Sequence, residues 1–161
     1  MIAAHERSQA VVGALTDPAG IPQPAGTRVK IFLYYIGKAR DAHANAMAEE
    51  YMKRATRFTK CEMREIDPRR FDPWDKHEQG LKVLLDPAGR AMDSAKFTAL
   101  FDRDLVFVVG GAEGLLPAWR SRADLLLALS PLTMPHELAR VVLAEQIYRA
   151  LTTLRGHPYA R

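Results

Sequence analysis

The chain has 161 residues, of which 48% are hydrophobic and 26% are charged, with a formal net charge of +4. This balance is typical of one globular domain and excludes a disordered chain, and the apolar runs are far shorter than the ~20 residues that cross a bilayer. The single cysteine, Cys61, allows no internal disulfide and fits a cytoplasmic protein, while the mildly basic charge is compatible with a polyanionic partner but does not identify one.

Residues 1–27 are rich in proline and glycine and lack the charged start and long apolar core of a secretory signal. We expect a poorly ordered N-terminal extension there, followed by a single domain over residues 28–161.

The first half of this domain predicts two strands and a helix. Residues 29–36 are β-branched and aromatic, which indicates a buried strand. Residues 39–60 carry Met47, Tyr51, Ala55 and Phe58 at helical spacing, and a second strand is expected over 61–66. The proline-rich, charged segment 67–80 is expected to be a loop.

In the second half of the domain, predicted strands again alternate with predicted helices. Residues 81–85 predict a strand closed by a turn at 86–89, and residues 94–101 a short helix capped by Asp93 or Ser94. The apolar runs 105–109 and 125–130 predict two more strands, and residues 136–154 predict the longest helix. Such alternation indicates an α/β domain, in which ligands bind at the carboxyl ends of parallel strands. The turns after residues 85, 109 and 130 should therefore lie together.

Two of these turns have residue types that suit a small-molecule site. Gly110, Gly111 and Gly114 would let a ligand approach the backbone, although they match neither a dinucleotide fingerprint nor a P-loop. Taken alone, a glycine-rich turn after a strand is more often a plain turn than a binding site. In the loop 130–135, two prolines hold the backbone in set directions, which suits recognition of an adenine edge. The alternative is that Pro135 merely begins the next helix.

The helix 136–154 is apolar over much of its circumference. It is expected to bury Leu143, Ala144, Ile147, Tyr148 and Leu151. Val141 and Val142 add a second apolar side, which in so short a chain favours a subunit interface. Glu145 and Arg149 are four residues apart and form at least a simple helical ion pair, and the histidines show no metal-ligand spacing.

Several stretches resemble the ribosomal RNA large-subunit methyltransferase H family of the SPOUT superfamily, in order and spacing, from residue 29 to 161. They are VKIFLYYIGKARD (29–41), LLDPAGRAMDS (84–94), FVVGGAEGL (107–115), LSPLTMPHELARVVLAEQIYRA (129–150) and HPY (157–159). The resemblance implies a SPOUT-type α/β fold, with a mostly parallel sheet flanked by helices and a C-terminal trefoil knot, and a homodimer.

The implied reaction is transfer of a methyl group from S-adenosylmethionine to N3 of pseudouridine 1915 in 23S rRNA on the assembled 70S ribosome. By motif match, the cofactor-binding residues would be Leu85, Gly110, Gly111, Ser130, Pro131, Leu132, Thr133, Met134 and Pro135. The catalytic candidates are His136, Arg149, Tyr159 and Arg161, and the RNA-binding candidates are Arg140 and His157. Cations near a nitrogen that loses its proton favour the resulting anion, which gives the arginines a physical role.

The chain departs from the family in three places. Ala160 replaces a histidine that members usually carry, residues 67–80 are too few for the helix expected there, and residues 1–27 precede the usual start. These departures motivate the alternative of a catalytically weak ribosome- or RNA-binding protein with the same fold. A Rossmann-like nucleotide enzyme is disfavoured because its glycine fingerprint is missing.

Overall fold

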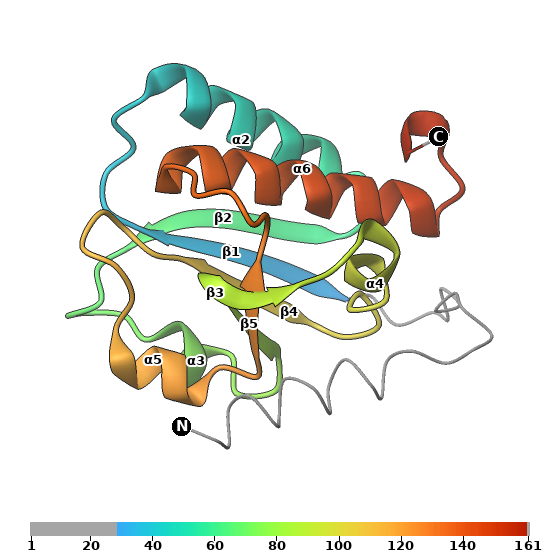
Figure 1. Ribbon diagram of the computed structural model, residues 1–161. Helices are drawn as coiled ribbons and strands as arrows, with labels where there is room; N and C mark the ends of the chain where they lie inside the picture. The colour runs from blue at the N-terminus through green and yellow to red at the C-terminus, as the bar shows by residue number, and fades with distance from the viewer. Residues whose placement is uncertain (1–28, 161) are drawn as a thin grey trace.

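The computed structural model describes residues 29–160, which form a five-stranded parallel sheet with helices on both faces (Figure 1). The strands are β1 (Lys30–Ile36), β2 (Lys60–Ile66), β3 (Leu81–Ala91), β4 (Leu105–Val109) and β5 (Leu125–Ala128). Their order across the sheet is β2-β1-β4-β3-β5, and every pairing is parallel. The prediction of an α/β fold with a parallel sheet is confirmed.

The helices divide between the two faces of the sheet. On one face α2 (Ala42–Ala55) and α6 (His136–Leu154) lie side by side, with α4 (Ser94–Thr98) beside them; the short helices α3 (Pro73–Lys76) and α5 (Pro117–Arg122) lie on the other (Figure 1). The 3-10 helix η1 (Pro158–Ala160) follows α6. Among residues 29–160, no helix is long and apolar enough to span a membrane.

Each strand contributes to two cores because successive side chains point to opposite faces of a sheet. In β1, Ile31 and Leu33 pack toward α2, α4 and α6, whereas Phe32 and Tyr34 pack toward α3 and α5. Strands β1, β4 and β5 therefore read as nearly continuous apolar runs, whereas the edge strand β2 alternates with charged residues.

The helix expected over residues 39–60 is shorter than predicted. The Asp41 carboxylate caps α2 by accepting hydrogen bonds from the His43 and Ala44 amides, and the helix ends at Ala55. Its buried residues are Ala48, Met52 and Ala55, whereas Met47, one of the predicted apolar positions, is 52% exposed.

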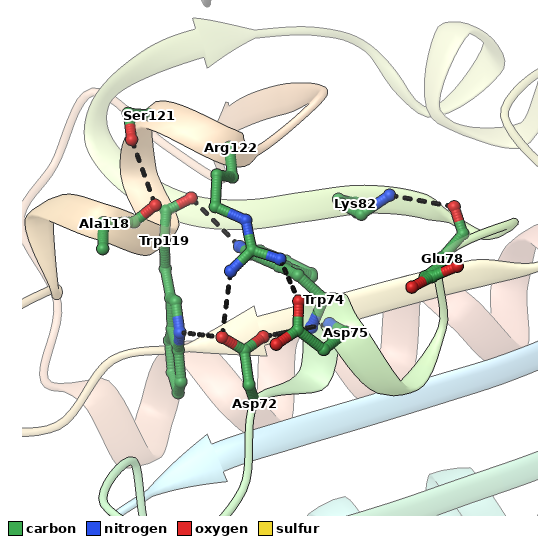
Figure 2. A network of polar contacts seen from close by, with 9 residues as sticks. All are labelled: Asp72, Trp74, Asp75, Glu78, Lys82, Ala118, Trp119, Ser121 and Arg122. Carbon is green, nitrogen blue, oxygen red and sulfur yellow. Dashed lines mark hydrogen bonds and ion pairs between the residues drawn. The ribbon is translucent and has the colours of Figure 1, made fainter.

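The prediction of a plain loop over residues 67–80 is wrong. Asp72 caps α3, and Trp74 in that helix is completely buried. The indole of Trp74 donates to the Trp119 carbonyl, and Asp72 accepts from the indole of Trp119 and the guanidinium of Arg122 (Figure 2). One tryptophan and one carboxylate thus join α3 to α5, a helix that the sequence analysis did not predict.

Strand β3 continues through the turn expected at residues 86–89. Leu85 and Arg90 both pair with Leu127, so the chain leaves the sheet between them and then rejoins it. Asp86 stabilises this excursion by accepting a hydrogen bond from the Ala88 amide at 2.9 Å. The turn was placed correctly, but the strand does not end there.

Three features predicted from the sequence are not tested by these observations. The N-terminal extension over residues 1–27 and the C-terminal Arg161 lie outside the described residues. The trefoil knot stays a prediction of the family resemblance.

Candidate functional site

A cavity of about 410 Å³ opens at the carboxyl ends of β3, β4 and β5. It is lined by Leu85, Asp86, Pro87, Val109, Gly110, Gly111, Ala112, Gly114, Leu115, Leu127, Leu129, Ser130, Leu132, Thr133, Met134, His136 and Ala139. The turns after residues 85, 109 and 130 lie together, as the rule for parallel sheets predicted. A volume in this range suits a small-molecule ligand.

Most of the predicted cofactor-binding residues line this cavity. They are Leu85, Gly110, Gly111, Ser130, Leu132, Thr133 and Met134. Pro131 and Pro135 are not in the lining, although they belong to the loop that forms one wall. The catalytic candidate His136 also lines the cavity, at the first turn of α6.

The glycines at the end of β4 are needed for packing against the protein itself. A Cβ at Gly110 would lie 2.7 Å from Cδ2 of Leu115, and one at Gly111 would lie 3.0 Å from the Ile36 carbonyl oxygen. Gly114 has a φ of +87°, and its amide donates to the Gly111 carbonyl. The plain-turn interpretation therefore accounts for these glycines, and the turn so formed is also a wall of the cavity.

The proline loop leads directly into α6. Pro135 occupies the N-cap position, and Ser130 Oγ accepts a hydrogen bond from the Leu132 amide at 3.0 Å. In the first turn of α6, Glu137 accepts hydrogen bonds from the Arg40 and Asp41 amides, at 2.6 and 3.2 Å. This carboxylate ties the β1–α2 loop to the start of α6, beside the cavity.

The lining is largely apolar, and its ionisable side chains are Asp86 and His136. Asp86 is buried, with Oδ2 2.9 Å from Nη2 of Arg120, a contact that is an ion pair without hydrogen-bond geometry. Within residues 29–160, no lysine or arginine lines the cavity. The largely apolar lining therefore suits a ligand with an apolar ring, and Asp86, which is paired with Arg120, adds little net charge to it.

Two further catalytic candidates meet at the opposite end of α6. Arg149 Nη2 lies 2.7 Å from Glu145 Oε1, and the Tyr159 hydroxyl donates to the same oxygen at 2.9 Å. The Arg149 guanidinium also lies over the Tyr159 ring, 5.3 Å from its centroid. Burial, followed by the neighbouring Tyr51 and Glu145, raises the pKa of Tyr159, so this phenol keeps its proton at neutral pH.

The two groups of catalytic candidates do not meet within one chain. His136 and Arg149 are separated by thirteen residues of one helix, or about 20 Å at 1.5 Å per residue. Neither Arg149 nor Tyr159 lines the cavity at the carboxyl ends of the strands.

Arg140, an RNA-binding candidate, is 1% exposed and points into the protein. Its guanidinium lies 3.9 Å from the centroid of the Tyr35 ring and donates to Asn45 Oδ1 at 2.9 Å, while Nη2 is buried without a hydrogen-bond partner. An arginine enclosed in this way has no surface to offer a phosphate. His157 is exposed, and the other candidate, Arg161, lies outside the described residues.

The sequence analysis missed Asp86 among the lining residues. It follows Leu85 at the same strand end, so the strand-end rule applied to both positions. Across residues 29–160, no cluster of three histidine, cysteine or acidic side chains is arranged to hold a metal ion.

Comparison with known proteins identifies relatives along most of the chain. The family model described as "Predicted SPOUT methyltransferase" matches residues 29–160. A protein of Solibacter usitatus named ribosomal RNA large subunit methyltransferase H is 59% identical over 139 residues, covering 83% of this chain and 100% of that protein. A protein of the same name from Nitrosospira multiformis is 37% identical over 155 residues, covering 83% of this chain and 99% of its own length.

Proposed function

Because this chain belongs to the SPOUT methyltransferases, among relatives named ribosomal RNA large subunit methyltransferase H, we propose that it methylates ribosomal RNA with S-adenosylmethionine as methyl donor. The site we propose is N3 of pseudouridine 1915 in 23S rRNA, on the assembled 70S ribosome. A ribosomal substrate would place the protein in the cytoplasm. The observation that carries the proposal is the cavity at the carboxyl ends of β3, β4 and β5, which the family's motif residues line.

The lining of this cavity fits the proposed cofactor. Leu85, Leu127 and Met134 offer apolar surface to an adenine ring, and the loop 130–135 offers backbone groups to its edge. Among the described residues no lysine or arginine lines the cavity, so a positively charged sulfonium would meet no unpaired cation in that lining. When bound, the cofactor supplies an activated methyl group.

The contribution of the chain is to position the RNA nitrogen and to stabilise its deprotonated form. His136 lines the cavity, and its proposed role is to receive the N3 proton. Arg149 and Arg161 would provide positive charge next to the resulting anion. Tyr159 holds Glu145 and Arg149 in place through its hydroxyl and its ring, and we assign it positioning rather than proton transfer.

We propose that the active site is composite and lies at a homodimer interface. In an isologous dimer with antiparallel α6 helices, Arg149 and Tyr159 of one subunit would approach His136 of the other. The surface of α6 supports this arrangement: Leu138 is 48% exposed, and Leu132 in the cavity loop is 78% exposed. A partner subunit that packed on this end of α6 would cover such exposed apolar side chains.

The test is methyl transfer from tritiated S-adenosylmethionine to ribosomes that lack the modification. We expect label at N3 of the pseudouridine in 70S particles, little in free 23S rRNA, and none when uridine replaces the pseudouridine. If ribosomes bind the protein but no rRNA becomes labelled, the alternative of a catalytically weak binding protein, motivated by Ala160, replaces the enzyme.

A further inference from the structure

A second cavity lies away from the proposed active site, on the sheet face that carries α3 and α5. We call it the β1–β2 groove. It has a volume of about 620 Å³ and is lined by Lys30, Phe32, Tyr34, Lys60, Glu62, Arg64, Phe71, Lys76, His77 and Asp104. Phe32 and Tyr34 belong to the core on this face, whereas Leu85, Val109 and Leu127 of the cofactor cavity belong to the other core.

The floor of the groove is a packed layer of aromatic rings. The His77 ring stacks on Phe32 with centroids 4.0 Å apart, and its Nε2 shares a hydrogen bond of 2.6 Å with the Tyr34 hydroxyl. Phe71 packs against Tyr34 at 5.1 Å. Burial, followed by the charge of Lys76, lowers the pKa of His77, so its ring is neutral at pH 7. His77 and Phe71 are both half-buried and leave part of each ring open to the groove.

The rim of the groove is basic. Arg64 lies over the Phe71 ring at 4.5 Å, and Lys30, Lys60 and Lys76 are exposed. Within residues 29–160, none of these four cations has an ion pair within 4.0 Å. The lining contains two acids, Glu62 and Asp104, and Asp104 accepts a hydrogen bond from the Lys30 amide at 2.9 Å.

We propose that the β1–β2 groove binds single-stranded RNA as a contact separate from the active site. Unpaired cations suit the phosphate backbone, and the half-buried rings of His77 and Phe71, with the Arg64 guanidinium plane over Phe71, suit contact with unpaired bases. The choice of RNA as occupant rests on the proposed function and on charge, since the lining carries four basic side chains and two acidic ones. The β1–β2 groove would be a second surface through which the enzyme holds its ribosomal substrate.

The first test compares two double variants that lose the same charge. Lys60→Ala/Lys76→Ala removes two cations of the groove, and Lys53→Ala/Lys96→Ala removes two exposed lysines of α2 and α4. Binding of a fluorescein-labelled ten-nucleotide RNA is measured by anisotropy over a range of salt concentrations. We expect the groove variant to bind about 10-fold more weakly at low salt, with a salt slope shallower by about 1.4, because each single-strand phosphate contact adds about 0.7. The control should stay within about twofold of wild type.

The second test locates the contact. Photocrosslinking with a 4-thiouridine-containing RNA should attach label to peptides from residues 60–78, and less so in the groove variant. Equal RNA binding by the two double variants would overturn the proposal. A groove variant that binds the oligonucleotide normally but 70S ribosomes weakly would also overturn it, since the groove would then meet an acidic protein surface. Failure of the proposed function would be seen in another experiment: wild-type protein would transfer no tritiated methyl group to rRNA.

Discussion

At the residue scale, Arg140 is a charged side chain that is buried inside the protein. It lies between α6, α2 and the sheet, where Tyr35 of β1 and Asn45 of α2 contact its guanidinium. No carboxylate pairs with it among the ion pairs of residues 29–160. A buried charge that lacks a paired anion contributes little to stability, because desolvation offsets its attractions.

Replacing this side chain with an apolar one of similar length should therefore be tolerated. We expect Arg140→Met to change the free energy of unfolding by less than about 1 kcal/mol, and Arg140→Ala to lower it by about 2–4 kcal/mol because it leaves a cavity. Urea denaturation measures both. Arg140→Met should also bind RNA as wild type does; a stable Arg140→Met protein that loses RNA binding would restore the RNA-binding role.

Cys61 is the only thiol of the chain and lies on β2, partly buried under the α2 side of the sheet. Burial raises its pKa to about 12, so the reactive thiolate is scarce at physiological pH. We expect a disulfide reagent at pH 8 to modify the native protein at least about 10-fold more slowly than the urea-unfolded protein. Equal rates would mean that the β2 edge opens readily.

At the element scale, α3 is too short to be stable alone and depends on its neighbours. Asp72 accepts hydrogen bonds from the Trp74 and Asp75 amides and also binds Trp119 and Arg122 of α5 (Figure 2). Asp72 thus joins the two helices on one face of the sheet, together with the Trp74–Trp119 hydrogen bond and the ion pair between Asp75 and Arg122.

Removing this carboxylate should weaken the whole face. We expect Asp72→Ala to lower the free energy of unfolding by about 2–3 kcal/mol, through the lost cap and the lost bonds to α5. Asp67→Ala, which removes an exposed pair with Arg69, is the control and should lose much less. Equal losses would mean that the hydrogen bonds from Trp119 and Arg122 to Asp72 contribute nothing to the free energy of unfolding.

The contribution of Asp72 should also depend on pH. Burial raises its pKa, but the hydrogen bonds from Asp75 and Arg122 more than compensate and hold the pKa below its ordinary value. A carboxyl with a lowered native pKa stabilises the fold above its unfolded pKa of about 3.9 and loses this effect as pH falls further. The difference in unfolding free energy between wild type and Asp72→Ala should be full at pH 7 and shrink at pH 3.

At the scale of the whole molecule, the separation of His136 from Arg149 decides how many chains make one site. If both belong to one site within a chain, each damaged subunit is inactive whatever its partner. If the site is shared, a dimer of one His136→Ala and one Arg149→Ala subunit keeps one of its two sites intact.

Mixing the two variants after reversible unfolding tests this geometry. Random pairing makes about half of the dimers mixed, and each mixed dimer has one intact site of two, so about a quarter of wild-type activity should return. Each variant alone should be nearly inactive, and both should be dimers by light scattering. A mixture no more active than its components would place the site within one chain.

The relation between sequence and structure differs between the cavity and the rest of the fold. The largely apolar runs at residues 105–109 and 81–85 predict buried strands. In a parallel sheet the carboxyl ends of such strands lie at one edge, so the loops that follow them should lie together. For this reason, the position of the cavity walls at the ends of these strands follows from local composition. The same reasoning failed over residues 67–80, where Trp74 stands among charges and shows no periodicity, because its burial depends on α5, which lies over forty residues later.

The sequence by itself determined the strands, the longest helix and which three turns meet at one cavity, since these depend on local apolar patterns and turn chemistry. The family resemblance added many of the residues that line this cavity. Only the tertiary structure decided that Arg140 is enclosed, that Arg149 and Tyr159 share Glu145 far from His136, and that Lys60 and Lys76 border an aromatic groove. Those arrangements join residues distant along the chain or fix the direction of one side chain, and local patterns do not specify either.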